Sequence, residues 1–125
     1  ITLPAADAIL HGDTIKYESG HNRDNIGFWM NAGDWVEWKF QITRPGVFTV
    51  SAPIAAMGSG AFQVIVGDRK LQAAAPVTGD YGRFKVVPLG QLEIASPGKV
   101  SLQVRAVKDG WKPLNLRSIT LRPAK

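Results

Sequence analysis

The sequence has no cysteine among its 125 residues, and this absence excludes two classes of protein. Neither a disulfide scaffold nor a metal site with thiolate ligands can form without that residue. There is also no apolar run long enough for a membrane-spanning helix. No signal peptide is visible, but the chain begins at Ile1 rather than Met. We therefore expect a processed or partial chain, and the missing leader says little about its compartment.

Acidic residues are fewer than basic ones, with 10 Asp and Glu against 15 Lys and Arg and a formal net charge of +5. Such an excess favours polyanionic partners. The basic residues, however, are spread from Lys16 to Lys125 without a dense cluster. We interpret most of them as solvated strand faces rather than as a nucleic-acid surface.

Helical periodicity is missing as well, and residues 5–10 could form at most one short turn. Instead, 13 glycines and 8 prolines separate short stretches in which apolar and polar residues alternate. Residues 36–42 and 100–106 show this alternation most clearly. About eight or nine such strands in one chain must form two layers to bury their apolar faces. The sequence therefore predicts an all-β, two-sheet antiparallel jelly-roll β-sandwich, with residues 1–125 as a single domain.

Turn residues predict how the strands are joined. The sequence Arg44-Pro45-Gly46 would connect residues 36–42 to residues 47–52 as a hairpin. Residues 17–25 are polar and read as a long loop. Three further features are expected: a hairpin turn at Gly67-Asp68, an edge position or strand end at Pro88, and a bend near Arg117-Ser118.

Three of the four tryptophans lie between Asn25 and Ile42. Trp29 belongs to a Gly- and Asn-rich loop, whereas Trp35 and Trp38 begin and occupy the strand that follows it. We expect Trp38 in the core and Trp35 at an end of the sandwich. For Trp111 a core position and a ligand contact both remain open.

Loop aromatics of this kind suit sugar binding. The C–H face of a pyranose packs on an aromatic ring, which offers apolar area at a low cost in side-chain entropy. An asparagine offers both a donor and an acceptor to neighbouring hydroxyls. Four such residues lie in Gly-rich loops or at strand ends, where binding sites are commonly built: Trp29, Tyr81, Trp111 and Asn115.

Catalytic constellations are absent from the sequence. A glycosidase needs two carboxylates facing each other, and no spacing places two of the acidic residues together. His11 and His21 have no partner at metal-ligand spacing. Neither a nucleophile elbow nor a phosphate-binding loop is present. The sequence therefore predicts a protein that is not an enzyme. The acidic residues considered are Glu18, Asp24, Asp34, Glu37 and Asp80.

Several short motifs occur in an order that resembles the carbohydrate-binding modules of families six and thirty-five. Residues 33–38, Gly-Asp-Trp-Val-Glu-Trp, are similar to their G-D-W-V-E-Y segment, and the resemblance extends over residues 25–121. The other matching segments are Pro45-Gly46-Val47-Phe48-Thr49-Val50, Thr78-Gly79-Asp80-Tyr81-Gly82-Arg83-Phe84, Pro97-Gly98-Lys99-Val100-Ser101-Leu102 and Leu114-Asn115-Leu116-Arg117-Ser118-Ile119.

The resemblance implies a galactose-binding-like sandwich without catalysis of its own, beside an extracellular polysaccharide-degrading enzyme. It places the sugar in a cleft of end loops, between an aromatic residue that precedes Gly-Asp-Trp and Tyr81, with Asn115 on the hydroxyls. The aromatic residue is Phe28 or Trp29, and we favour Trp29. Relatives also hold a structural calcium ion near their N-terminus, where this chain offers Asp7.

Glu18 and Asp24, with loop carbonyls, are the other calcium candidates, because calcium takes oxygen ligands. We expect an oligo- or polysaccharide ligand, an attached or neighbouring glycoside-active domain, and a secreted, periplasmic or cell-surface location in bacteria. The alternative is a structural or protein-interaction domain that docks onto a catalytic domain. The expected sugar-binding residues are Trp29, Tyr81, Trp111, Asn115, Phe28, Glu18 and Asn25. An acidic sugar would use Arg23, Lys112 or Arg117 as counter-charges.

Overall fold

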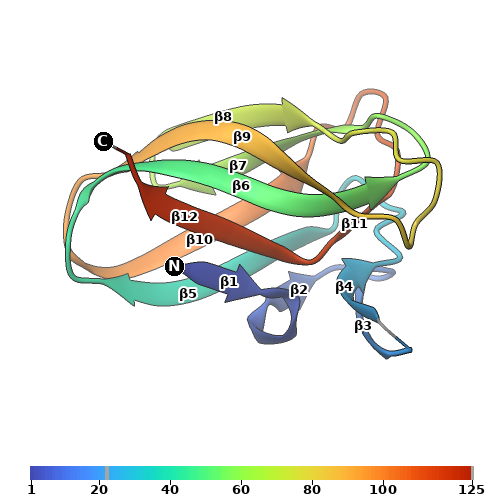
Figure 1. Ribbon diagram of the computed structural model, residues 1–125, viewed down its shortest axis with the longest axis horizontal. Helices are drawn as coiled ribbons and strands as arrows, with labels where there is room; N and C mark the ends of the chain where they lie inside the picture. The colour runs from blue at the N-terminus through green and yellow to red at the C-terminus, as the bar shows by residue number, and fades with distance from the viewer. Residues whose placement is uncertain (22, 125) are drawn as a thin grey trace.

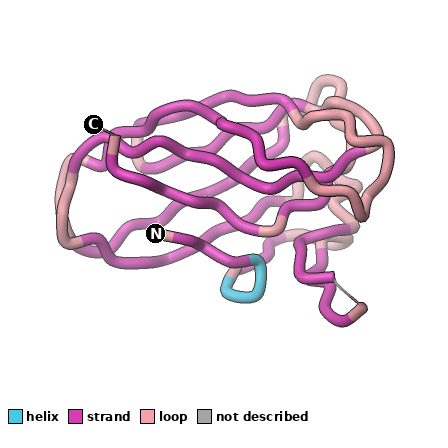
Figure 2. Tube along the Cα trace, viewed as in Figure 1, coloured by secondary structure: helices cyan, strands magenta, loops and turns pink. Residues whose placement is uncertain are grey.

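A computed structural model describes residues 1–21 and 23–124, which fold into two facing layers of strands (Figures 1 and 2). One short 3-10 helix, η1, is the only helical element of this described part, and none of its helices is long and apolar enough to cross a membrane. The elements are β1 (Thr2–Pro4), η1 (Ala5–Asp7), β2 (Ile9–His11), β3 (Lys16–Gly20), β4 (Arg23–Gly27), β5 (Trp35–Ile42), β6 (Gly46–Ala56), β7 (Ala61–Val66), β8 (Arg69–Ala74), β9 (Lys85–Ile94), β10 (Gly98–Ala106), β11 (Leu114–Leu116) and β12 (Ser118–Pro123).

The strands form a five-stranded sheet, with the order β2-β5-β10-β7-β8, and a seven-stranded sheet. The larger sheet has the order β1-β12-β6-β11-β4-β3, and β9 pairs with the other side of β6. Every strand pair is antiparallel. The predicted all-β, two-sheet antiparallel jelly-roll sandwich is confirmed.

The apolar alternation identified in the sequence marks the inner faces of both sheets. Val36, Trp38 and Ile42 on β5 are buried, as are Val100, Leu102 and Val104 on β10. The indole nitrogen of Trp38 donates a hydrogen bond to the carbonyl of Pro4, 2.8 Å away, so the polar atom of this core tryptophan is satisfied. The core position predicted for Trp38 is confirmed.

The hairpin predicted at residues 44–46 is wrong. β5 lies in the five-stranded sheet and β6 in the seven-stranded sheet, so the turn between them crosses from one layer to the other. Two strands in which apolar and polar residues alternate, joined by a short turn, can pair edge to edge in one sheet or face each other across the core. Alternation alone does not distinguish these arrangements, because both bury one face of each strand.

The other predicted connections are present. β7 and β8 pair on either side of Gly67-Asp68, and Arg117 separates β11 from β12. Pro88 lies on β9, which pairs only with β6 in the described part of the chain. A bulge opposite Val50 and Ser51 leaves Leu89 as an extra residue. Because this bulge interrupts the alternation, Leu89 is buried and Val86 is exposed.

The segment read as a loop at residues 17–25 forms an antiparallel hairpin of β3 and β4. This hairpin projects beside the end of the sandwich (Figure 1), and most of β3 is exposed. Since both faces of β3 contact solvent, its sequence shows no apolar alternation that would mark it as a strand. Asn22, which belonged to the predicted loop, lies outside the described residues.

Candidate functional site at the loop end of the sandwich

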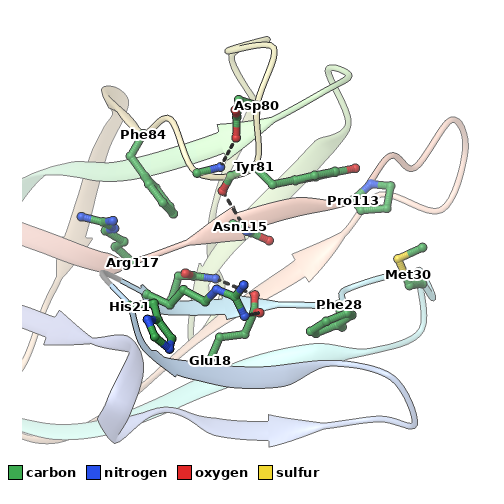
Figure 3. A pocket seen from close by; sticks show the side chains of 13 residues that line it. Glu18, His21, Phe28, Met30, Asp80, Tyr81, Phe84, Pro113, Asn115 and Arg117 are labelled. Carbon is green, nitrogen blue, oxygen red and sulfur yellow. Dashed lines mark hydrogen bonds and ion pairs between the residues drawn. The ribbon is translucent and has the colours of Figure 1, made fainter.

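A pocket of about 590 Å³ opens between the β3–β4 hairpin and the loops at the same end of the sandwich (Figure 3). Three segments that are distant in the sequence, residues 18–30, 80–84 and 113–117, contribute to it, so the fold creates the site. Its lining residues are Glu18, His21, Arg23, Asn25, Phe28, Met30, Asp80, Tyr81, Gly82, Phe84, Pro113, Asn115 and Arg117.

Phe28 and Tyr81 supply aromatic surface on two sides of this pocket, with Asn115 between them in the view of Figure 3. The Phe28 side chain is 56% exposed and that of Tyr81 is 42% exposed. Phe28 has a φ of 52°, a left-handed conformation that is unfavourable for a bulky residue. The ammonium group of Lys16 lies 5.9 Å from the centroid of its ring.

Hydrogen bonds fix the loop that presents Tyr81. The amide nitrogen of Asn115 donates to the Tyr81 carbonyl, at 3.0 Å, and this bond ties the loop to β11. Within the loop, the Asp80 carboxylate accepts the backbone N–H of Gly82 at 2.7 Å. The hydroxyl of Thr78 donates to the Asp80 carbonyl at 2.9 Å. The Tyr81 side chain is therefore exposed on a braced backbone.

Glu18 lies at the centre of a polar network on the hairpin side of the pocket. Its Oε1 accepts a hydrogen bond from Asn25 at 3.1 Å, and its Oε2 lies 3.6 Å from the guanidinium of Arg23. Asn25 is buried, so this bond satisfies an amide that would otherwise be costly to bury. The network holds the carboxylate toward the pocket.

Gly27 makes room for two oxygen atoms at the base of the site. A β-carbon at this position would clash with Oε1 of Glu18 and would lie 3.1 Å from Oδ1 of Asn115. Both oxygens therefore converge over Gly27. Because the Asn115 nitrogen is already bonded to the Tyr81 carbonyl, the converging groups are acceptors. A ligand with hydroxyl donors fits this arrangement.

Arg117 and Phe84 form another part of the wall, where the guanidinium carbon lies 4.0 Å from the ring centroid of Phe84. Such stacking orients a guanidinium and covers one face of the ring. Arg23 and Arg117, two of the counter-charges expected for an acidic sugar, both line the pocket. Lys112 does not line it, and a β-carbon on Gly58 would clash with its side chain.

Of the seven expected sugar-binding residues, the structure brings five together in this pocket: Glu18, Asn25, Phe28, Tyr81 and Asn115. The preference for Trp29 over Phe28 is wrong. Trp29 is fully buried, and its indole nitrogen donates to the carbonyl of Asp34 at 2.9 Å. Adjacent residues of this loop face opposite ways, which the sequence alone does not reveal.

Trp111 is also absent from the pocket lining. It is partly buried against the core, and its indole nitrogen donates to the carbonyl of Trp29 at 2.9 Å. The two rings pack with centroids 5.2 Å apart and an interplanar angle of 52°. For Trp111 the structure therefore favours the core alternative over the ligand contact.

Asp34 ends the loop that carries Phe28 and Trp29 and joins that loop to the segment before β3. Its buried carboxylate accepts hydrogen bonds from the backbone N–H groups of Asp13, Thr14 and Ile15 and from the Thr14 hydroxyl. Burial by itself would raise the pKa of Asp34, but these hydrogen bonds lower it below its ordinary value. Gly12 is required beside it, because a β-carbon there would clash with the carboxylate.

The three calcium candidates do not fit one shared site. Asp7 lies on η1 and Asp24 on β4, and neither lines the pocket with Glu18. Asp24 accepts a hydrogen bond from the Tyr17 hydroxyl at 2.7 Å, whereas Glu18 is engaged by Asn25 and Arg23. Within residues 1–21 and 23–124, no group of three His, Cys, Asp or Glu side chains is arranged to hold a metal.

Sequence reasoning missed several lining residues. Asp80, Gly82 and Phe84 belong to the segment that carried the resemblance at residues 78–84, so that segment could have indicated them. Met30, His21 and Pro113 are not marked by any pattern. The glycine at position 27 is visible in the sequence, but its role depends on Glu18 and Asn115 meeting above it in the fold.

Comparison with known proteins supports the fold. No model of a protein family matches the sequence, and no curated protein matches it. Solved structures do match. The family 35 carbohydrate-binding module of Clostridium thermocellum has a TM-score of 0.81 at 11% identity, covering 98% of both chains. The carbohydrate-binding module of Cellvibrio mixtus lichenase 5A, solved with cellotriose, has a TM-score of 0.79 at 17% identity, covering 100% of this chain and 98% of that one.

This chain has the fold of those modules. The Podospora anserina β-(1,4)-mannanase that combines GH26 and CBM35 parts matches with a TM-score of 0.78 at 22% identity. That match covers 100% of this chain but only 28% of the mannanase chain. The fold that the sequence resemblance implied is therefore confirmed, and the similarity lies in one part of that larger enzyme.

Proposed function

We propose that this chain is a non-catalytic carbohydrate-binding module and that the loop-end pocket is its sugar site. The observation behind the proposal is that Phe28, Tyr81 and Asn115, from three distant segments, line one pocket. A pyranose ring would lie against the two exposed aromatic rings. Its hydroxyls would donate to the oxygens of Glu18 and Asn115 that converge over Gly27.

Two further observations support a binding role rather than a catalytic one. Glu18 and Asp80 are the carboxylates that line the pocket, and each is engaged in bonds that hold the site together. The structural neighbours include modules from families 6 and 35 that match nearly whole chains. We infer an oligo- or polysaccharide ligand, a neighbouring glycoside-active domain, and a secreted, periplasmic or cell-surface setting.

Calorimetric titration against a panel of neutral glycans tests this function. Wild-type protein should bind at least one glycan, and Tyr81→Ala should weaken that binding about tenfold or more, equal to about 1.4 kcal/mol. The melting temperature should barely change, because the Tyr81 ring is exposed. Val47→Ala is the control, since Val47 is exposed but does not line the pocket.

Flat titrations for every glycan would contradict the sugar-binding function. Tight association with a catalytic domain in that case would favour the docking alternative, in which the same exposed rings contact protein. A large fall in melting temperature for Tyr81→Ala would instead show that the ring stabilises the fold.

A further inference from the structure

The outer face of the five-stranded sheet is a second charged surface, separate from the loop-end pocket. Strand register places Lys39 opposite Ser101, and Gln41 opposite Lys99. Their neighbours on β5 and β10, Phe40 and Val100, are oriented toward the core. Basic side chains outnumber acidic ones on this face. Its charged residues are Lys39, Lys70, Lys99 and Arg105, with Glu37 as the acidic one.

A hollow of about 410 Å³ is lined by neighbouring residues of β5 and β10, Lys39 and Lys99 among them. The lining consists of Lys39, Phe40, Gln41, Lys99, Val100 and Ser101, and none of these is acidic. Lys39 and Lys99 lie on adjacent strands as diagonal neighbours, a separation that long side chains can span. Neither lysine forms an ion pair with a described residue. Lys39 acts on Glu37 through its charge without forming an ion pair, so both ammonium groups can still contact an anion.

The nearest acidic group on this face, Glu37, is already engaged. Its Oε2 accepts a hydrogen bond from the Ser101 hydroxyl at 2.7 Å, and its Oε1 lies 3.1 Å from Nε2 of His11. The Ser101 bond is the largest cause that lowers the pKa of Glu37, followed by the His11 bond, and the nearby charge of Lys39 lowers it further. Glu37 is thus charged at neutral pH, but its oxygens face Ser101 and His11.

The aromatic residue on this face is closed to stacking. Trp35 stacks on the His11 ring at a centroid distance of 3.8 Å, and the guanidinium carbon of Arg105 lies 3.9 Å from its ring. Because β2 and β10 flank β5 on opposite sides, His11 and Arg105 cover opposite faces of the indole. We expected Trp35 to close an end of the sandwich. Its ring instead packs between His11 and Arg105 on the outer face of this sheet. Phe40, the aromatic residue that lines the hollow, is packed against the core, so bases and sugars have no fully exposed ring here on which to stack.

We propose that the Lys39–Lys99 hollow binds the anionic groups of an acidic polysaccharide. The two ammonium groups would neutralise a carboxylate or sulfate, and the Gln41 amide would contact neighbouring hydroxyls. Charge complementarity selects a polyanion. The closed Trp35 ring argues against single-stranded nucleic acid, which such proteins hold by stacking bases on aromatic rings. The site acts independently of the loop-end pocket and of the neutral sugar proposed there.

Affinity electrophoresis and calorimetry with polygalacturonate, and separately with dextran sulfate, test this proposal. The double variant Lys39→Gln/Lys99→Gln should weaken binding at least tenfold in low salt. Lys85→Gln/Lys108→Gln removes the same charge from exposed positions outside the hollow, and it should change the affinity less than twofold. Raising the salt from about 0.01 M to about 0.15 M should weaken wild-type binding strongly, because screening lengths shorten.

Several results would overturn the proposal: no binding of either polymer, equal losses in both double variants, or equally tight binding of a single-stranded DNA oligonucleotide. Loss of polygalacturonate binding in Tyr81→Ala would assign the anion to the loop-end pocket instead. The two sites are separable, because neutral-glycan binding should depend on Tyr81 and remain unchanged in Lys39→Gln/Lys99→Gln. Failure of one proposal therefore does not imply failure of the other.

Discussion

Phe28 and Trp29 are adjacent, yet the structure uses them in opposite ways. Phe28 is 56% exposed on the rim of the loop-end pocket, with Tyr81 as the other rim residue, whereas Trp29 is 0% exposed and does not line the pocket. We call the group of buried Trp29, buried Asp34 and partly buried Trp111 the anchor cluster. The contrast shows that adjacent aromatic residues of one loop are placed differently: Phe28 lines the pocket where we propose that sugar binds, and Trp29 packs in the core.

The anchor cluster links parts of the chain that shape the pocket. Trp111 donates to the Trp29 carbonyl, and Trp29 donates to the Asp34 carbonyl. The Asp34 carboxylate in turn binds the backbone of residues 13–15, just before β3 begins. Changes in the cluster should therefore reduce stability, whereas changes in the rim should reduce binding.

The largest effect is expected for Trp29→Ala. Removing a fully buried tryptophan leaves a cavity and should cost about 3–5 kcal/mol of unfolding free energy. Its loss also removes the hydrogen bond to the Asp34 carbonyl and the ring contact with Trp111. Urea denaturation measures the loss. Phe28→Ala is the matched control, one residue away, and a similar loss of stability in both variants would contradict the division between rim and cluster.

A smaller effect is expected for Asp34→Asn, at about 1–3 kcal/mol, because an amide cannot satisfy all the donors that the carboxylate accepts. The folded-state pKa of Asp34 lies below its ordinary value of 3.8. The ionised carboxylate therefore stabilises the fold fully above that value, and this contribution disappears as the pH falls through the folded pKa.

The stability difference between wild type and Asp34→Asn should accordingly be constant near neutral pH and should shrink in acid. Urea midpoints across a pH series measure it. Glu37, whose pKa is also lowered, is unchanged in both proteins, so it cancels in the comparison. A difference that stays constant through the acid range would show that the charge of Asp34 does not stabilise the fold.

The sequence predicted most of the sandwich because its central strands each bury one face. The alternation in residues 36–42 and 100–106 identified the inner residues of β5 and β10. It failed for the β5–β6 connection, where a hairpin and a crossing between sheets give the same pattern. It also failed for β3, an exposed edge strand without an apolar face, and for β4, where only the last three residues are buried.

The site was predictable in part for similar reasons. Tyr81 and Asn115 belong to segments whose resemblance to known modules marked them, and both line the pocket. The choice between Phe28 and Trp29 was not predictable, because it depends on the φ of 52° that turns Phe28 outward. The Lys39–Lys99 hollow was missed because the two lysines are far apart in sequence and meet only through strand register.

The smallest effect is a difference between two substitutions at Phe28. Phe28→Ala and Phe28→Gly both remove the ring, so both should weaken sugar binding about equally, by roughly tenfold if the ring contributes about 1.4 kcal/mol. Their stabilities should differ, because Phe28 has left-handed backbone geometry. That conformation costs a residue with a β-carbon about 1–2 kcal/mol. Glycine avoids the cost but has greater freedom in the unfolded chain, which offsets about 0.5–1 kcal/mol.

Phe28→Gly should therefore be more stable than Phe28→Ala by about 0.5–1 kcal/mol, as the balance of those two terms. Urea denaturation of the pair measures this difference, and titration with the same glycan measures the shared loss of affinity. Both variants lose the contact with Lys16, so that contact cancels. If Phe28→Ala were as stable as Phe28→Gly, the left-handed backbone at this position would not be strained. If neither variant lost affinity, Tyr81 alone would define the rim.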